Sequence, residues 1–289
     1  MAGQDRKMTE AKFKRYLKEG RGQGEGSKYV PWIKIGEIPS SNGRQHRIKD
    51  PFNGRTHHLL SDLEAYYYYK CIWSDRVIDY REQFPLLPRS ETESIADRLG
   101  IKHPDDGGHF FVMTTDALLT IRDEEGEHTE ARHMKYKEDF DDERVREKEQ
   151  IEREFWVQKG IGYKVVTEDS ISIDQSKNIA LILAHYEQPQ IPGVNEEAIV
   201  GILNEVLYSI QEYQSYSLKE LGGYIDRIYG LPLGSGLNVF FFLAAHKVFK
   251  VKLDKPIIGT NRLEDVIDFS TFHPNTISEE VLLYESHAE

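Results

Sequence analysis

An antiparallel hairpin is the clearest pattern in the first half of the chain. Residues 110–120 and 128–137 both have the composition of short β-strands, and the turn sequence Asp123-Glu-Glu-Gly126 separates them. Asp116 lies in the first segment and Lys135 in the second. The pattern therefore predicts a carboxylate and an amine on adjacent strands.

Further segments of the first half alternate between helix and strand. Residues 9–19 and 141–159 have the apolar spacing of helices, residues 76–84 and 161–166 alternate as strands, and residues 89–109 predict a loop or short helix. Ser61 is the predicted N-cap of another amphipathic helix, which runs to about Trp73 and has Glu64 in the capping-box position. This order predicts an α/β fold with a mixed sheet.

The second half has a different pattern and predicts a separate, mostly helical domain. A polar stretch over residues 167–177 marks the boundary, which divides the chain into domains 1–168 and 169–289. Helices are expected over residues 178–186, 195–213 and 237–247, and another is expected to start at the capping box Ser217-Leu-Lys-Glu220. Residues 248–253 then alternate as a strand. Helices followed by a late strand pair are in the order of a winged helix.

Composition narrows the class of protein. The chain has 289 residues, of which 39% are hydrophobic, so there is enough apolar material for globular domains. Its single cysteine, Cys71, excludes an intramolecular disulfide and a CxxC zinc site, and this favours a reducing, cytoplasmic compartment. The sequence shows no signal peptide and no uncharged apolar run long enough to span a membrane, so no membrane role is expected.

Charge argues against indiscriminate nucleic-acid binding. The formal net charge is −12, whereas binding to a phosphate backbone depends on basic side chains. Positive charge is nevertheless concentrated near the N-terminus, where it could form a local footprint on DNA, with an ordinary solvated helix face and linker as the equally weighted alternative. The candidate phosphate-binding residues are Lys14, Arg15, Lys18, Arg21, Arg44 and Arg47.

Glu64, Asp116 and Lys135 together have the chemistry of a metal-dependent phosphodiesterase. Mg²⁺ binds oxygen ligands and usually takes only one or two carboxylates from the protein. A lysine beside the cation can hold the attacking hydroxide or offset charge on the phosphorus. From spacing alone the pattern is common, and Glu64 could equally be a helix cap and Asp116 an ordinary strand residue.

A series of short motifs adds to this interpretation. Over residues 14 to about 168 they occur in the same order as in the TnsA family of transposon-end endonucleases, which the chain resembles. The motifs are Lys18-Glu-Gly-Arg-Gly-Gln-Gly24, Tyr29-Val-Pro-Trp32, Ile38-Pro-Ser-Ser41, His57-His-Leu-Leu-Ser-Asp-Leu-Glu64, Asp79-Tyr-Arg-Glu-Gln-Phe-Pro-Leu-Leu-Pro88, Gly100-Ile-Lys-His-Pro104, Thr114-Thr-Asp116 and Asp142-Glu-Arg144.

The resemblance implies a fold, an activity and partners. The family's N-terminal half has the PD-(D/E)XK restriction-endonuclease fold, its acidic residues correspond to Glu64 and Asp116, and its lysine corresponds to Lys135. Its C-terminal half is winged-helix-like. The expected function is Mg²⁺- or Mn²⁺-dependent cutting of the 5′ strand at transposon ends in a bacterial cytoplasm, while a TnsB-like recombinase cuts and joins the 3′ strand. A TnsC-like ATPase is the expected partner of the second domain.

The chain departs from the family pattern at one position. A glutamine is expected two residues before the lysine, and this chain has His133 there. A neutral imidazole can bind a metal, but it suits zinc or manganese better than magnesium. The carbonyl of Met134 is the alternative ligand at this corner, so the number of metals stays open. Gln83 could also face the metal, although a structural hydrogen bond is the favoured alternative.

Two other functions remain open. The chain could be an assembly adaptor of the transposase with weakened catalysis, which would bind its partners without cutting. It could instead be a stand-alone restriction or repair nuclease, which would cut without partners. Residues 181–289 contain fifteen acidic and seven basic residues, and the resulting charge of −8 favours protein docking over DNA reading in the second domain.

Overall fold

The computed structural model describes residues 8–37, 43–105 and 111–272 of the chain. These residues form two compact units, which divide between Ser172 and Ile173. The boundary expected from the sequence, after residue 168, is four residues before this observed division.

A four-stranded sheet is the centre of the first unit. Its strands are β3 (Val77–Pro85), β4 (Thr114–Asp123), β5 (Gly126–Met134) and β6 (Gly162–Val166), in the order β3-β4-β5-β6. Neighbours β3, β4 and β5 pair antiparallel, whereas β6 pairs parallel to β5. The predicted hairpin is therefore confirmed. The second strand is shorter than predicted, because β5 ends at Met134 and Lys135 follows the strand directly.

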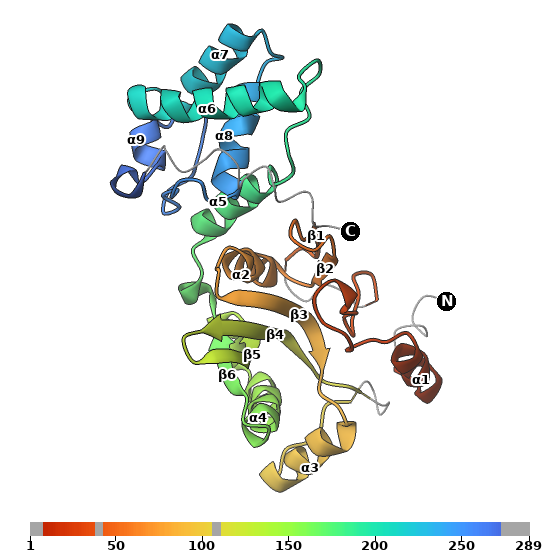
Figure 1. The fold of residues 1–289 in the computed structure, drawn as a ribbon. Helices are drawn as coiled ribbons and strands as arrows, with labels where there is room; N and C mark the ends of the chain where they lie inside the picture. Colours follow the sequence, from red (N-terminus) through yellow and green to blue (C-terminus); the bar gives the residue numbers. More distant parts are fainter. Residues whose placement is uncertain (1–7, 38–42, 106–110, 273–289) are drawn as a thin grey trace. The chain divides into compact units, whose positions relative to one another are not determined.

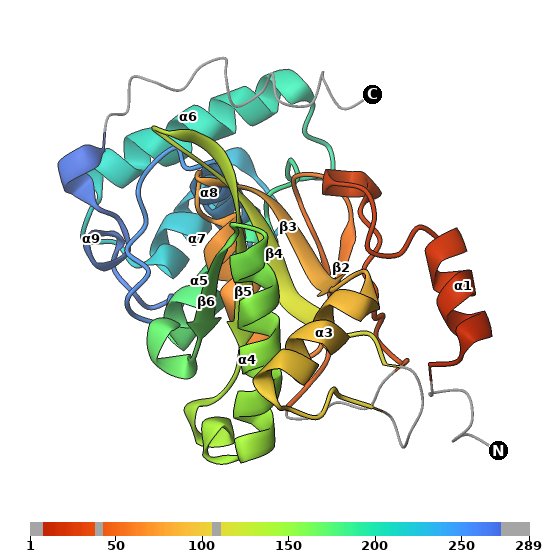
Figure 2. The same cartoon turned by 90° about the horizontal axis from the view of Figure 1, so that it is seen from below.

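Helices cover both faces of this sheet, as Figures 1 and 2 show. On one face α2 (Asp62–Ile72) packs through a core that includes Tyr68 and Leu119. On the other face α3 (Arg89–Leu99) and α4 (Glu143–Gln158) pack through Ile151 and Trp156. The tyrosines of α2 contribute to this core, since Tyr68 is fully buried. The result is a layered α/β unit with its sheet buried on both sides.

The N-terminal segment adds smaller elements beside the sheet. They are α1 (Glu10–Lys18), the 3₁₀ turn η1 (Gly26–Lys28) and a hairpin of β1 (His46–Lys49) and β2 (Thr56–Leu59). The helix α1 was predicted, but the hairpin was not. Two further 3₁₀ turns, η2 (Lys137–Asp141) and η3 (Glu168–Ser170), flank α4 and β6.

The second unit is helical within its described residues. Its elements are α5 (Ile173–Leu183), α6 (Glu196–Glu212), α7 (Leu218–Tyr229), α8 (Ser235–Ala245), α9 (Leu263–Val266) and the 3₁₀ turn η4 (Phe269–Thr271). The predicted capping box of Ser217 and Glu220 is present at the start of α7. Helices α5, α6 and α7 all pack on α8, which contains a run of buried residues from Val239 to Ala245.

Two predictions for the second unit are wrong. Residues 248–253 form no strand. Val251 makes a single bridge to Ile267, and the backbone hydrogen bonds beside this bridge involve only Lys250 and Lys252. The strand pair of a wing is therefore absent among the described residues. Helix α5 also begins at Ile173 instead of residue 178. Within the described ranges, no helix has both the length and the apolar character needed to cross a bilayer.

Candidate active site

Glu64 is a buried carboxylate at the first turn of α2. Ser61 caps this helix, because its Oγ accepts from the Glu64 backbone N–H at 3.1 Å. The Glu64 carboxylate bends back and accepts from the Leu60 N–H at 2.9 Å and from Ser61 Oγ at 3.0 Å. Burial and the nearby negative charge of Asp116 raise the pKa of Glu64 to about 8. The cap geometry thus fixes an acidic group beside β4.

Gln83 supports this carboxylate from the neighbouring strand. Its Nε2 donates to Glu64 Oε2 at 3.1 Å, and its Oε1 accepts from Thr114 Oγ1 at 3.3 Å. The backbone of Gln83 has a positive φ of 48°, which is uncommon for a residue other than glycine. The Trp32 N–H donates to the Gln83 carbonyl at 3.2 Å. Gln83 therefore makes structural hydrogen bonds, which was the favoured alternative for this residue.

Asp116 lies in β4, opposite the part of β3 that contains Gln83. The residues on either side of Asp116, Thr115 and Ala117, pair with Phe84 and Glu82. Its Oδ2 accepts from the Met134 backbone N–H at 2.6 Å and lies 3.6 Å from His133 Nδ1. The sheet register therefore brings Asp116, His133 and the backbone of Met134 together, and Glu64 of α2 lies near enough to Asp116 to feel its charge.

Glu152 is a member of this group that the sequence analysis missed. It lies on α4, is buried, and has its Oε2 2.9 Å from His133 Nδ1. Its other oxygen accepts from Thr115 Oγ1, which in turn accepts from the Trp156 indole N–H. Burial alone would favour neutral His133, but Glu152 and Asp116 outweigh it and raise the pKa of the imidazole to about 9. His133 is therefore paired with α4.

Lys135 follows β5 at the edge of this group. Its backbone N–H donates to the Val166 carbonyl at 3.1 Å, which ties the residue to β6. Its Nζ lies 3.8 Å from Asp139 Oδ2, and the side chain is 30% exposed. Burial and the nearby charges of Arg144 and Lys135 lower the pKa of Lys148 on α4. Two lysines therefore come close together at this end of the sheet.

The donor chemistry of the group fits a divalent cation in part. The buried carboxylate of Glu64 and the partly buried carboxylate of Asp116 repel each other, and oxygen donors are those that Mg²⁺ prefers. His133 does not fit as a ligand while it faces Glu152, because a protonated imidazole has no lone pair to offer. In this arrangement no three Asp, Glu, His or Cys side chains among the described residues are positioned to hold one ion together.

The basic residues predicted to contact DNA have different environments. Arg21 is buried, and its guanidinium donates to Glu37, Glu19 and the Trp32 carbonyl, so it is not placed to reach a phosphate. The other residues are exposed. Lys14 pairs loosely with Glu10, and Arg15 with Glu19, the C-cap of α1. Lys18 ends that helix, Arg44 lies 3.6 Å from Asp62, and Arg47 lies on β1 opposite His58.

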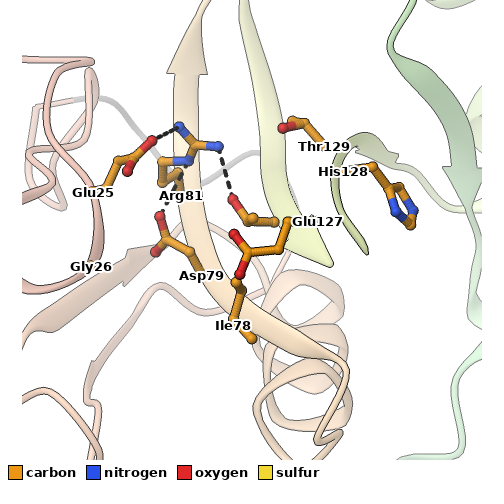
Figure 3. A pocket seen from close by; sticks show the side chains of 9 residues that line it. Glu25, Gly26, Ile78, Asp79, Arg81, Glu127, His128 and Thr129 are labelled. Carbon is orange, nitrogen blue, oxygen red and sulfur yellow. Dashed lines mark hydrogen bonds and ion pairs between the residues drawn. The ribbon is translucent and has the colours of Figure 1, made fainter. Parts of the chain in front are cut away.

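A cavity of about 460 Å³ lies elsewhere on the first unit, around Arg81 of β3. Figure 3 shows Arg81 pointing toward Glu25 and Asp79, whose carboxylates lie 3.6 and 3.4 Å from its nitrogens. Glu127 and His128 also line it. None of the predicted catalytic residues contributes to this cavity, and its excess of carboxylates disfavours a DNA backbone there.

Two comparisons relate the chain to known proteins. The family described as TnsA-like endonuclease N terminal matches residues 74–168, a range that contains Asp116, His133, Lys135 and Glu152 but begins after Glu64. The transposon Tn7 transposition protein TnsA of Escherichia coli is 37% identical over 255 residues, which cover 88% of this chain and 90% of that protein. With this identity over nearly its whole length, the chain belongs to the TnsA family of transposon endonucleases.

Proposed function

We propose that this protein is the metal-dependent endonuclease subunit of a transposase, with a catalytic unit of the PD-(D/E)XK type that cuts the 5′ strand at each transposon end. The observation that carries the proposal is the pairing of a buried carboxylate, Glu64 at the start of α2, with the partly buried carboxylate of Asp116 in β4, with Lys135 directly after β5. An acidic helix residue close to an acidic strand residue, with a lysine directly after the neighbouring strand, suits phosphodiester hydrolysis.

The roles of the residues follow from their positions. Glu64 and Asp116 would hold Mg²⁺, with Mn²⁺ as a substitute, and Lys135 would orient the attacking water or offset charge on the phosphorus. The bound cation would lower the pKa of that water. Gln83 and the Leu60 N–H hold the Glu64 carboxylate, and the Met134 N–H holds Asp116, so both acids are oriented before any ion binds. Glu152 would restrain His133 beside them.

A TnsB-like recombinase and a TnsC-like ATPase are the proposed partners, and transposon-end DNA is the proposed substrate. The relative from Escherichia coli is named as a transposition protein, which favours work within such an assembly. The second unit is the proposed docking part. Its helix α8 is buried along most of its length, which disfavours insertion of that helix into a DNA groove.

Strand-resolved mapping of cuts tests this function. The protein is incubated with labelled transposon-end DNA, with and without the partner recombinase, in Mg²⁺ and in Mn²⁺. Cuts in the 5′ strand that require the partner are expected. Partner-independent cutting would favour a stand-alone nuclease. An assembled complex that gives no 5′ cut in either metal would favour the adaptor and contradict the proposal.

Replacement of His133 by glutamine is expected to preserve or raise Mg²⁺-supported cleavage. The reason is that His133 is held by Glu152 and offers no lone pair to a cation, whereas glutamine supplies a neutral oxygen. Cleavage rates in Mg²⁺ and Mn²⁺ measure the effect, with the melting temperature as a check on folding. A severe loss of rate in a folded His133→Gln protein would show that the imidazole itself is required.

The double replacement Arg44→Gln and Arg47→Gln is expected to weaken binding to end DNA and to reduce the salt slope of binding by about two. Both side chains are exposed near the β1–β2 hairpin, which leads into the helix of Glu64. Anisotropy titrations over a range of salt concentrations measure the slope. The control is Arg76→Gln with Arg98→Gln, two exposed arginines paired with Asp123 and Glu154. Equal losses in both double variants would exclude a specific role for the hairpin.

A further inference from the structure

Four tyrosines, Tyr213, Tyr216, Tyr224 and Tyr229, make contacts where α6 and α7 of the second unit meet, and Tyr208 lies on the same side of α6 as Gly201. We call these five residues the tyrosine ridge. The rings of Tyr213 and Tyr216 stack at 4.8 Å, and Tyr213 meets Tyr224 edge to face at 5.7 Å. Tyr229 reaches across to α6, where its hydroxyl donates to the Gly201 carbonyl at 3.2 Å. These contacts tie α7 to α6 and to its C-cap at two places.

The outer part of this ridge is open to solvent. Tyr208 is 54% exposed and Tyr229 is 42% exposed, although both are large aromatic side chains. Ile228, next to Tyr229, is 45% exposed. Exposed tyrosines that are already held by neighbours lose little conformational freedom on binding, and tyrosine is enriched at the centres of protein interfaces. The ridge therefore has the composition of a docking surface.

Glu205 is the charged group at the centre of the ridge. It lies on the same side of α6 as Gly201 and Tyr208, from which it is separated by one helical turn. Gly201, one helical turn before Glu205, accepts from the hydroxyl of Tyr229, so Glu205 lies close to the point where Tyr229 meets α6. Burial raises the pKa of Tyr224 and Tyr229, and the Glu205 carboxylate contributes in both cases. Its Oε1 accepts weakly from Ser209 Oγ at 3.4 Å. Among the described residues, no lysine, arginine or histidine pairs with it.

The charge around Glu205 selects the kind of partner. Helix α6 contains four glutamates and neither lysine nor arginine, and Lys219 and Arg227 are the only such residues between positions 178 and 246. Nucleic acid would be repelled, because binding to a single strand combines aromatic stacking with positive charge. An arginine satisfies both features of the ridge, since its guanidinium stacks on tyrosine and pairs with a carboxylate.

We propose that the tyrosine ridge docks an arginine-bearing segment of a protein partner, with one guanidinium stacked on Tyr208 or Tyr229 and paired with Glu205. This inference is independent of the cleavage chemistry, because the ridge lies wholly within the second unit. Lysine is a weaker fit, because its ammonium is more strongly hydrated and has no flat face to stack.

Fluorescence anisotropy with the full-length protein tests the proposal. The probe is a short labelled peptide in which arginine alternates with glycine and leucine, compared with the same peptide carrying lysine. The arginine peptide is expected to bind about threefold more tightly than the lysine peptide. Glu205→Gln and Tyr208→Ala are each expected to weaken binding of the arginine peptide about fivefold.

Two control variants separate docking from general attraction to an acidic protein. Glu264→Gln removes the same charge at another exposed site of the unit, and Ile173→Ala truncates another exposed apolar side chain. Both are expected to leave peptide affinity unchanged, with melting temperature confirming the fold of every variant. Failure of the arginine peptide to bind, or equal losses in Glu264→Gln and Glu205→Gln, would overturn the proposal. Binding of a single-stranded oligonucleotide that is lost in Tyr208→Ala but kept in Glu205→Gln would instead assign the ridge to nucleic acid.

Discussion

Asp116→Asn is expected to reduce cutting of the 5′ strand by about a thousandfold while the protein remains folded. Asparagine has nearly the same shape, and its oxygen can still accept from the Met134 N–H that now donates to Asp116 at 2.6 Å. What is lost is the negative charge beside Glu64, which the proposed chemistry needs in order to hold a cation. The measurement is the single-turnover cleavage rate on end DNA with the partner recombinase and Mg²⁺.

Two controls make this result specific. Asp123→Asn changes the last residue of the same strand, where the aspartate pairs with Arg76 at 3.0 Å, and it is expected to cut at the normal rate. Joining of the 3′ strand by the recombinase is expected to continue with Asp116→Asn, because that reaction belongs to the partner. Normal 5′ cutting by folded Asp116→Asn would show that the assigned site is not the catalytic one.

The sequence was most informative where local rules and tertiary structure agree. The cap at Ser61 identified the helix of Glu64, and the turn before Gly126 identified the hairpin that contains Asp116. These features depend on neighbouring residues in the chain, so they can be predicted without the fold. The convergence of Glu64 with Asp116 required more, and it was expected only because the chain resembles a known family.

Glu152 was missed because its surroundings in the sequence are highly charged. Residues 141–159 were predicted only as a helix, yet Glu152 lies one turn before the buried Phe155 and Trp156 and is itself buried. A carboxylate in line with apolar residues was the available signal, but only the structure shows that His133 is its partner. Glu152 can be buried because His133, which lies far away in the sequence, pairs with it.

Short or weakly patterned elements were the other errors. Strands β1 and β2 have four residues each and are mostly polar, so alternation could not identify them. Residues 248–253 alternate well, but no strand pairs along them. Phe249 and Val251 are instead buried in a loop beside Ile267. Alternation reports which side chains are buried, while a strand also needs a partner with free backbone groups.

A buried ionic cluster anchors β2 to β3 in the first unit. Arg55 Nη1 donates to both oxygens of Glu82 at 2.8 and 2.9 Å, and its Nη2 donates to the Tyr80 carbonyl at 2.6 Å. His57 lies between two acids, with Nδ1 2.9 Å from Glu82 and Nε2 3.4 Å from Asp50. Glu82 is fully buried and precedes Gln83, the residue that supports Glu64.

Glu82→Gln is expected to lower the free energy of unfolding of this unit by about 3 to 5 kcal/mol, because it leaves the charges of Arg55 and His57 buried without their main partner. Urea unfolding followed by tryptophan fluorescence reports on this unit, since Trp32, Trp73 and Trp156 all belong to it. The control Glu127→Gln breaks an exposed pair with Arg122 and is expected to cost less than about 1 kcal/mol.

The effect of Glu82→Gln should also depend on pH in a defined way. Burial opposes charge on Glu82 and Asp50, but their contacts, above all those with His57, outweigh it and lower both pKa values, so their contribution is present above about pH 4 and is lost as pH falls through the folded-state values. Burial also opposes charge on His57, yet Asp50 and Glu82 raise its pKa, so its contribution is complete below about pH 6.5 and is lost as pH rises through the raised value. The destabilisation is therefore expected to be largest near pH 5 to 6 and smaller on both sides.

A double variant separates two explanations of the cost of Glu82→Gln. If the cost reflects an unpaired buried charge, Arg55→Met combined with Glu82→Leu should recover most of the lost stability. A double variant as unstable as Glu82→Gln would show that the cluster stabilises the fold through its ion pairs themselves.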